Sequence, residues 1–310
     1  MKLSILVTFY NQTQFIDKTL ESIVSMNFDF DYEIIIGDDG SKDNSLELIK
    51  KWEKQYPNIS HYVMDRKDGV YYNPIQRASL NRVNILKHAK GEYVAFLDGD
   101  DFYSDKDKFN KQIKVLDENK SLSCSASNCY LYWNDDKKQL MNKATKSKIV
   151  KAKDYWRLGY YHISTFVFRN YFLNKEIDFN DKCFDDNYIA FVFLKYGDMY
   201  YFGEPTTCYR QAEVSLWHDA DEIEKNITNL IDYKFEIVYN PNLENESIRR
   251  HLKEWKYLKS ANLNDEEFRP TFKKRLEDLS INVYELVNIK ISCLGFKIFV
   301  DKVLRKIKGI

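Results

Sequence analysis

The stretch Ala95–Tyr103 has the sequence AFLDGDDFY, an apolar run that ends in three closely spaced carboxylates. These carboxylates belong to Asp98, Asp100 and Asp101, and they repel one another unless a cation or a hydrogen-bond network neutralises them. A buried strand followed at once by such a cluster is typical of an α/β sheet, in which ligands bind outside the carboxyl ends of the strands. A solvated acidic turn is the simpler interpretation, and this stretch alone does not decide between the two.

A second apolar run ends in the same way. Residues 33–37 (EIIIG) lead directly into the acidic turn Asp38-Asp39-Gly40-Ser41. Gly40 suits a tight turn that brings the backbone close to a ligand. Two acidic strand ends within one alternating pattern of strands and helices indicate a ligand site at the edge of a parallel sheet more strongly than either end does alone.

Apolar periodicity predicts alternating strands and helices over the first two thirds of the chain. Strands are expected at residues 3–10, 33–37, 61–64, 92–97, 121–133 and 163–169. Helices are expected at residues 13–26, 45–56, 75–90, 106–118 and 185–196. Strands separated by helix-length segments predict right-handed βαβ units, and therefore an α/β fold with a mostly parallel sheet flanked by helices.

The character of the chain changes near residue 219. Residues 221–286 are highly charged, follow a helical period and contain no glycine. We therefore expect an α/β domain over residues 1–218 and a helical C-terminal region over residues 219–310. Within that region, residues 296–308 place apolar side chains on one helical face and basic ones mostly on the other. Such a helix can lie on an anionic membrane surface, and packing against the protein itself is the alternative.

Composition excludes several classes of protein. Lys+Arg and Asp+Glu both number 47, and a net charge of zero argues against a nucleic-acid binder. The five cysteines are odd in number and show no metal-binding spacing, which favours a reduced, cytoplasmic protein. No signal peptide is recognisable at the N-terminus, and no apolar stretch reaches the ~20 residues that span a bilayer. We expect a cytoplasmic protein, peripheral at the inner face of the plasma membrane if the basic helix binds lipid.

Several ordered motifs resemble those of the family 2 glycosyltransferases of bacterial capsule and surface-polysaccharide synthesis, which have the GT-A fold. The resemblance covers roughly residues 3–218. The motifs that carry it are SILVTFYN at 4–11, DDGSKDNS at 38–45, Arg82 nine positions before Gly91, FLDGDD at 96–101, Lys108 with Gln112, FDDN at 184–187, and the segment from Glu204 to His218. The resemblance implies a GT-A domain at residues 1–218.

This resemblance implies an inverting transfer of a single sugar from a nucleotide-diphosphate donor, expected to be a UDP-sugar, to a saccharide or lipid-linked saccharide acceptor. It implies a Mn²⁺ or Mg²⁺ ion that neutralises the departing diphosphate, since hard oxygen ligands suit these ions. Asp100 is the implied main metal ligand, Asp98 is expected near both ribose and metal, and His218 is a further candidate ligand.

Donor-binding roles also follow from the resemblance. Asp39 is expected to accept a hydrogen bond from the nucleotide base, whereas Asp38 either helps there or holds the turn. Arg82 and Arg210 are candidates for the diphosphate because guanidinium binds phosphate oxygens bidentately, with structural ion pairs as the alternative. The remaining donor-binding candidates are Thr8, Tyr10, Gly99 and Trp217.

Asp186 is the expected general base, and Asp185 is the fallback, because the two acids occupy the position of the family's Glu-Asp motif. A carboxylate beside another acid has a raised pKa, which helps proton abstraction. Capping of the following helix is the alternative for both. His162 and Ser164 lie in a segment that faces acceptors in the family.

Two rival functions are considered. A sugar-phosphate nucleotidyltransferase also has an α/β nucleotide-binding domain, but it needs a glycine-rich phosphate loop after the first strand, and residues 9–12 (FYNQ) lack glycine. A non-catalytic nucleotide-sugar-binding assembly subunit is the other rival. The acidic residues at 98, 100 and 186 argue against it, since such a subunit has no need of them.

Overall fold

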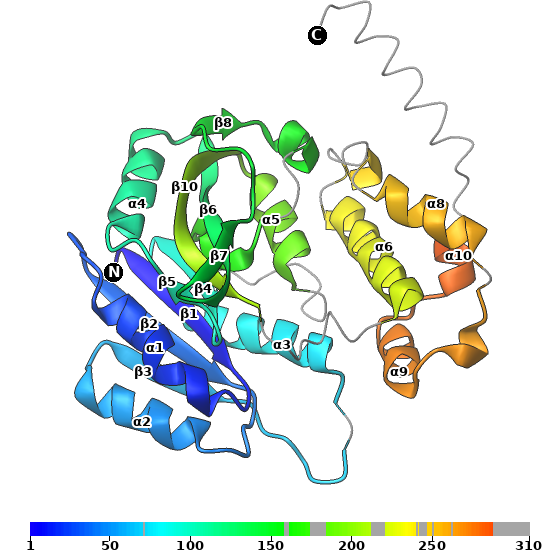
Figure 1. Cartoon of the computed structure of the whole chain (residues 1–310), viewed down its shortest axis with the longest axis horizontal. Coiled ribbons are helices and arrows are strands. Elements are labelled where there is room, and N and C mark those ends of the chain that lie inside the picture. The colour runs from blue at the N-terminus through cyan, green and yellow to red at the C-terminus, as the bar shows by residue number, and fades with distance from the viewer. Residues whose placement is uncertain are drawn as a thin grey trace, which may run out of the picture. The chain divides into compact units, whose positions relative to one another are not determined.

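The computed structural model of the chain describes residues 1–70, 72–157, 161–173, 184–211, 221–239, 241, 247–249, 251–261 and 263–287. The chain divides into two compact units, Met1–Ser215 and Leu216–Ile310. The first unit is a sheet with helices packed on it, and the second is a group of helices (Figure 1). The predicted assignment of a GT-A domain to residues 1–218 stays a prediction.

One ten-stranded sheet organises the first unit, in the order β3-β2-β1-β4-β9-β6-β10-β5, with β7 beside β6 and β8 beside β10. The strands are β1 (Leu3–Phe9), β2 (Tyr32–Asp38), β3 (Ile59–Val63), β4 (Tyr93–Asp98), β5 (Phe102–Tyr103), β6 (Leu122–Asn134), β7 (Lys137–Leu140), β8 (Lys148–Val150), β9 (Val167–Arg169) and β10 (Asp198–Arg210). Strands β3, β2, β1 and β4 run parallel to one another, and β6 runs parallel to β10, whereas β5, β7, β8 and β9 pair antiparallel with their neighbours. The predicted α/β class with a mostly parallel sheet is confirmed.

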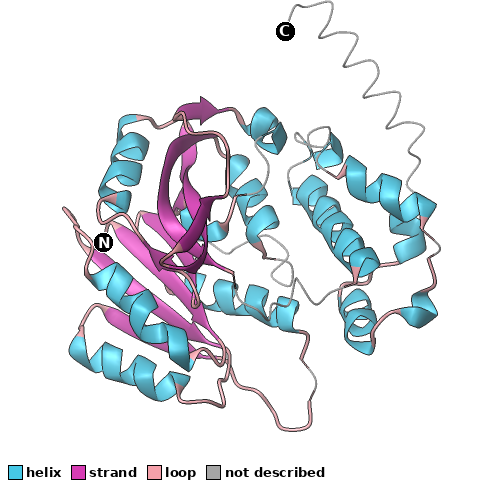
Figure 2. Cartoon of the chain, in the orientation of Figure 1, coloured by secondary structure: helices cyan, strands magenta, loops and turns pink. Residues whose placement is uncertain are grey.

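Helices cover both faces of this sheet (Figure 2). They are α1 (Thr13–Val24), α2 (Ser45–Gln55), α3 (Pro74–Leu86), α4 (Lys108–Glu118) and α5 (Asp186–Leu194), with 3-10 turns η1 (Ala152–Arg157) and η2 (Ile163–Thr165). Helices α1, α2 and α4 bury their apolar stripes against one face, which includes Ile5, Val7 and Ile36. Because the central strands are buried on both faces, their sequences are almost continuously apolar.

Strand register brings the two acidic turns together. Thr8, near the end of β1, pairs with Gly37 on one side and with Asp98 on the other. The carboxyl ends of β2 and β4 therefore flank the end of β1 at the same edge of the sheet. This edge is where a parallel α/β sheet binds its ligands.

Several segments differ from the sequence-based expectation, among them the short strands β5, β7 and β8, which were not predicted. The predicted strand at 163–169 is wrong in its first half, because residues 163–165 form the turn η2. There the His162 side chain accepts a hydrogen bond from the Ser164 amide, and the Thr165 hydroxyl donates to the His162 carbonyl at 2.7 Å. These side-chain hydrogen bonds take the place of the backbone hydrogen bonds that a neighbouring strand would provide. Strand β10 was not predicted, since it contains Gly203 and Pro205, and register shifts around them accommodate both residues.

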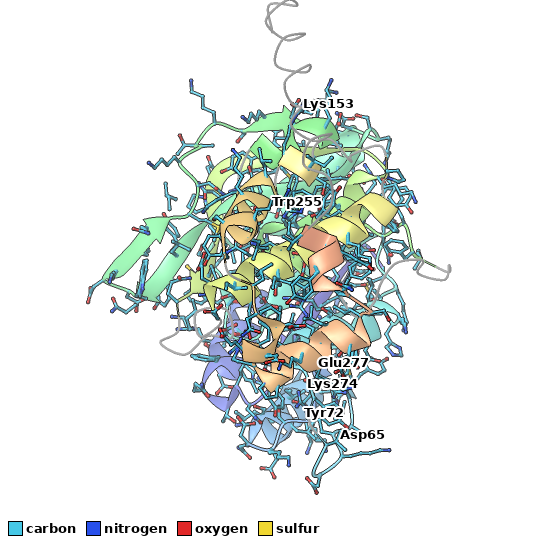
Figure 3. The ribbon with its side chains drawn as sticks, turned by 90° about the vertical axis from the view of Figure 1, so that its right-hand side faces the viewer. Asp65, Tyr72, Lys153, Trp255, Lys274 and Glu277 are labelled. Atoms are coloured by element: carbon cyan, nitrogen blue, oxygen red, sulfur yellow. The ribbon has the colours of Figure 1, made fainter. Side chains whose placement is uncertain are left out.

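The second unit contains helices α6 (Glu222–Tyr239), α8 (Leu252–Ser260), α9 (Pro270–Asp278) and α10 (Val283–Val287). Trp255 is fully buried, lies 4.4 Å from the Tyr233 ring centroid, and donates through Nε1 to the Leu286 carbonyl at 3.2 Å (Figure 3). Within the described residues, no helix combines the length and the apolar character needed to cross a membrane. The basic amphipathic segment 296–308 lies outside the described residues.

A buried lysine links α4 to the turn η2. Lys108 is fully buried, and its Nζ donates to Gln112 Oε1 at 2.6 Å and to the Thr165 carbonyl at 2.9 Å. Gln112 Nε2 donates to the same carbonyl at 3.0 Å. Burial lowers the pKa of Lys108 to about 7, against the opposing charge of Asp105. The folded chain therefore releases this proton far more readily than an ordinary lysine does.

We expect the free energy of unfolding to rise between pH 7 and pH 9, and to rise less in Lys108→Met. In this window an unfolded lysine, with a pKa of about 10.4, holds a proton that the folded protein has begun to release, so raising the pH favours the folded state. Urea titrations across this range measure the effect. Lys114→Met, at an exposed position of the same helix, is the control. An equal rise in both variants would contradict the prediction.

Candidate active site

The acidic loop after β4 is held rigidly by its backbone. The Gly99 amide donates to the Thr8 carbonyl at 2.9 Å, and the Thr19 hydroxyl lies 2.8 Å from the carbonyls of Gly99 and Asp101. A Cβ at Gly99 would overlap the ring of Phe9, so this close approach requires glycine. The loop thereby places three carboxylates at the sheet edge in a fixed arrangement.

Arg82, on α3, joins two of the predicted site acids. Its Nη2 lies 2.8 Å and 3.0 Å from the two carboxylate oxygens of Asp98, and 3.2 Å from Asp186 Oδ1. Burial raises the pKa of Asp98, but the charges of Arg82 and His162 outweigh it and hold this pKa below its usual value. Asp98 and Asp186 thus belong to one charge network, although 88 residues separate them in the sequence.

The neighbouring acids Asp185 and Asp186 have different environments. Asp185 is the N-cap of α5, and its Oδ1 accepts from the Tyr188 amide at 3.1 Å. Asp186, one residue later, accepts from the Ile163 amide at 3.3 Å through Oδ2 and contacts Arg82 through Oδ1. The capping alternative therefore describes Asp185, whereas Asp186 points to the acidic cluster.

His162 lies at the centre of the carboxylates. Its Nε2 is 3.8 Å from Asp98 Oδ2 and 4.0 Å from Asp186 Oδ2, and its Nδ1 is 3.4 Å from Asp101 Oδ2. The ring stacks on Tyr209 at a centroid distance of 4.0 Å, which fixes its orientation. Sequence reasoning gave His162 little weight because its position in the chain, 61 residues after Asp101, carries no motif.

These groups suit a divalent cation. Asp98, Asp101 and His162 each offer one ligand atom, and the three atoms lie within 4.8 Å of one another. Burial, followed by the charges of Asp100 and Asp98, raises the pKa of Asp101 well above its usual value. Burial and the charge of Asp98 likewise raise the pKa of Asp100. A cation would relieve this repulsion, and carboxylate oxygens are the ligands that Mg²⁺ and Mn²⁺ prefer.

Arg210, at the end of β10, closes the acidic loop from the other side. Its Nε donates to the Asp100 carbonyl at 2.7 Å, and its amide donates to Asp101 Oδ1 at 2.9 Å. Its guanidinium carbon lies 4.6 Å from the Phe15 ring centroid. Two other predicted site residues, Trp217 and His218, lie outside the described residues.

The second acidic turn is built differently. Asp38 is fully buried, and it accepts from the Ser41 amide at 2.9 Å and from the Ser41 hydroxyl at 2.5 Å, so it holds the turn. Asp39 forms ion pairs with Arg66 and with Arg77, whose Nε donates to Oδ1 at 2.6 Å.

Tyr10 lies next to this ion-paired group. The guanidinium carbon of Arg66 lies 4.0 Å from the centroid of the Tyr10 ring, and the residue Tyr10 is 39% exposed. Arg77 packs in the same way over Tyr72 at 4.8 Å. Sequence reasoning missed both arginines because they follow Asp39 by 27 and 38 residues in a segment without a motif.

We expect Asp39→Ala to lower the free energy of unfolding by about 3 to 5 kcal/mol, because it leaves two largely buried guanidinium groups without their carboxylate. Chemical denaturation at neutral pH measures the change. Asp68→Ala, which breaks the exposed ion pair with Lys42, is the control and should change stability little. A loss no larger than the control's would show that Asp39 is not a structural counter-ion.

Comparison with known proteins identifies the family. Residues 4–178, more than half of the chain, match the family described as Glycosyl transferase family 2. The chain belongs to this family. A dTDP-rhamnosyl transferase, RfbG of Shigella flexneri, is 27% identical over 237 residues, covering 73% of this chain and 76% of its own length. TuaG of Bacillus subtilis, described as a putative teichuronic acid biosynthesis glycosyltransferase, is 32% identical over 124 residues, covering 40% of this chain and 44% of its own length.

Solved structures confirm the predicted GT-A fold for this family 2 member. S. aureus TarS 1-349, solved in complex with UDP-GlcNAc, superposes with a TM-score of 0.62 at 17% identity, covering 90% of this chain and 80% of TarS 1-349. At that identity the likeness concerns the fold alone. The chain spans about a third of the length of the first curated relatives that it matches. The roles predicted for individual residues stay predictions.

Proposed function

We propose that this family 2 protein is an inverting, metal-dependent glycosyltransferase that moves one sugar from a UDP-sugar to a saccharide or lipid-linked saccharide acceptor in surface-polysaccharide synthesis. One observation carries the proposal: a single sheet edge gathers Asp98, Asp101, His162 and Asp186 around one position, with Asp100 in the same loop. The UDP-GlcNAc bound to TarS and the teichuronic acid assigned to TuaG support the donor class and the acceptor class.

Donor binding uses the ends of β1, β2 and β4. Asp98, Asp100, Asp101 and His162 are the residues that would hold Mn²⁺ or Mg²⁺, with His218 as a further candidate. When bound, the cation supplies positive charge that stabilises the departing diphosphate. The nucleoside would lie beside Tyr10 and the ion-paired group formed by Asp39, Arg66 and Arg77.

Proton transfer is assigned to Asp186. Inversion in one displacement requires a base on the acceptor side that takes the hydroxyl proton as the new bond forms. Asp186 is the acid of the Asp185–Asp186 pair that faces the cluster, since Asp185 caps α5. Arg82 orients the Asp186 carboxylate and compensates the negative charges of both Asp186 and Asp98.

The proposal also explains why the rivals fit less well. After β1 the chain turns through Asn11, whose φ of 51° is unusual for a residue other than glycine, and its Oδ1 accepts from the Lys42 amide at 2.8 Å. This side-chain-bonded turn differs from the glycine-rich phosphate loop of a nucleotidyltransferase. A binding subunit without catalysis would have no use for two neighbouring, repelling acids such as the half-buried Asp100 and the buried Asp101.

Contact with a membrane completes the proposal. A lipid-linked acceptor would place the protein at the inner face of the plasma membrane. The basic amphipathic sequence at 296–308 suits such contact, because its lysines and arginines would meet anionic headgroups.

We expect titration calorimetry to show Mn²⁺-dependent binding of UDP-GlcNAc or another UDP-sugar, and Asp100→Ala to abolish that dependence. The reason is that Asp100 supplies part of the negative charge that attracts the cation. Asp31→Ala, at an exposed acid in the loop before β2, is the control. If no nucleotide sugar binds with either metal, the glycosyltransferase proposal is overturned.

We expect Asp186→Asn to lower turnover by about 10²- to 10⁴-fold while leaving donor binding nearly intact, because an amide cannot accept the acceptor's proton. Asp185→Asn is the matched control: asparagine also caps helices well, so turnover should stay near that of the wild type. Steady-state rates and donor affinities of both variants measure the effect. A larger loss in Asp185→Asn would reassign the base.

A further inference from the structure

A lysine-rich segment follows the β6–β7 hairpin turn. Residues 137–153 (KKQLMNKATKSKIVKAK) contain no aspartate or glutamate, in a chain whose total charge is zero. Their lysines are Lys137, Lys138, Lys143, Lys146, Lys148, Lys151 and Lys153, all exposed. We call this set the lysine ridge. Charge of one sign concentrated in this way creates a local potential that attracts anions over a distance of about a Debye length.

The lysine ridge follows the edge of the sheet away from the site. Strand β7 pairs with β6, and Lys138 lies opposite Tyr132, which in turn pairs with Arg210 of β10. Strand β8 pairs with the other end of β10, at Met199 to Tyr201. Figure 1 shows β7 over the sheet and β8 at its upper edge. At roughly 3.3 Å per residue, the 13 residues of β10 correspond to about 40 Å.

Most of this charge is uncompensated. In the part of the chain that the structure describes, Lys151 alone among the ridge lysines forms an ion pair, with Asp198 at 2.8 Å. The neighbouring strand β10 contributes one other carboxylate, the exposed Glu204. Lys153 lies at the far end of the ridge (Figure 3). Ammonium groups without a carboxylate partner remain available to an external anion.

Aromatic rings connect the lysine ridge to the active site. Lys138 Nζ lies 4.9 Å from the Tyr130 ring centroid, and Lys18 Nζ lies 5.0 Å from that of Tyr132. The Arg210 guanidinium lies 5.5 Å from the same Tyr132 ring and bonds the acidic loop. The Tyr132 hydroxyl donates to Asp135, an acid in the hairpin turn, at 2.8 Å. Cations and flat rings therefore alternate from the site outwards, with Tyr132 buried and Tyr130 half-buried beneath the lysines.

We propose that the lysine ridge binds the acceptor, and that this acceptor is a polyanionic saccharide with phosphate or carboxylate groups along its length. A linear track that starts at the active site suits an extended chain, because successive anionic groups can meet successive lysines. Hydrated ammonium groups on flexible stems tolerate several anion geometries, as a repeating polymer requires. The acceptor role rests on the proposed function, whereas the binding of a polyanion does not.

The test uses two fourfold variants of the full chain. In the ridge variant, four lysines that form no ion pair within the described residues become glutamine: Lys143→Gln, Lys146→Gln, Lys148→Gln and Lys153→Gln. In the control variant, four exposed lysines elsewhere in the same unit become glutamine: Lys50→Gln, Lys51→Gln, Lys54→Gln and Lys114→Gln. Both remove equal charge. Fluorescence anisotropy with labelled oligogalacturonate, and with inorganic polyphosphate, measures affinity over a range of salt concentrations.

We expect the ridge variant to bind both probes about tenfold or more weakly than the wild type, with a smaller slope of log affinity against log salt, because fewer counterions are released. The control variant should bind like the wild type. Equal weakening in both variants would overturn the proposal, since net charge would then explain it. Binding to phosphatidylglycerol vesicles without binding to either soluble probe would overturn it in favour of a membrane surface.

Calorimetry with a UDP-sugar separates this proposal from the proposed function. A ridge variant that keeps the wild-type nucleotide affinity and loses the polyanion supports a separate acceptor surface. A wild-type protein that binds polyanions through the ridge but no nucleotide sugar supports the ridge and contradicts the glycosyltransferase proposal. A wild-type protein that binds the nucleotide sugar but neither polyanion contradicts the ridge alone.

Discussion

Charge compensation at the carboxyl edge of the sheet is the constraint on which the site depends. Removing carboxylates from water costs several kcal/mol each unless paired cations and hydrogen bonds offset the cost. Arg82 offsets part of this desolvation cost because it forms ion pairs with both Asp98 and Asp186. Burial and the charges of neighbouring carboxylates raise the pKa of Asp100 and of Asp101. The edge is therefore held together by ion pairs and yet retains excess negative charge, which a cation would neutralise.

The rest of the first unit holds this edge of the sheet in position. The parallel register of β1, β2 and β4 aligns both acidic turns, and the apolar runs of these strands bury the sheet so that its edge cannot shift. Lys108 and Gln112 hold the turn that carries His162 through one shared carbonyl. The buried lysine therefore stabilises the turn that follows His162 by donating to a backbone carbonyl and to a side-chain amide oxygen.

Sequence patterns predicted this framework well and its details less well. Helices and strands with a long apolar period were predicted nearly to their observed ends, because a buried face on a regular helix or strand requires apolar residues at a regular spacing in the sequence. The strand β10 was not predicted, because Gly203 and Pro205 interrupt its alternation of apolar and polar residues. Its extended conformation depends on pairing with β6. The turn η2 was mistaken for strand because local hydrogen bonds from His162 and Thr165 compete with ladder bonds.

The sequence by itself determined the fold class, the two acidic turns, the acid pair at 185–186 and the family, because short-range periodicity and ordered motifs encode them. Only the tertiary structure decided which acid caps a helix and which faces the site. It also brought Arg66 and Arg77 to Asp39, and His162 to Asp98 and Asp101. These contacts join residues that are distant in the chain, and nothing in the local sequence at either partner records the distance between them after folding.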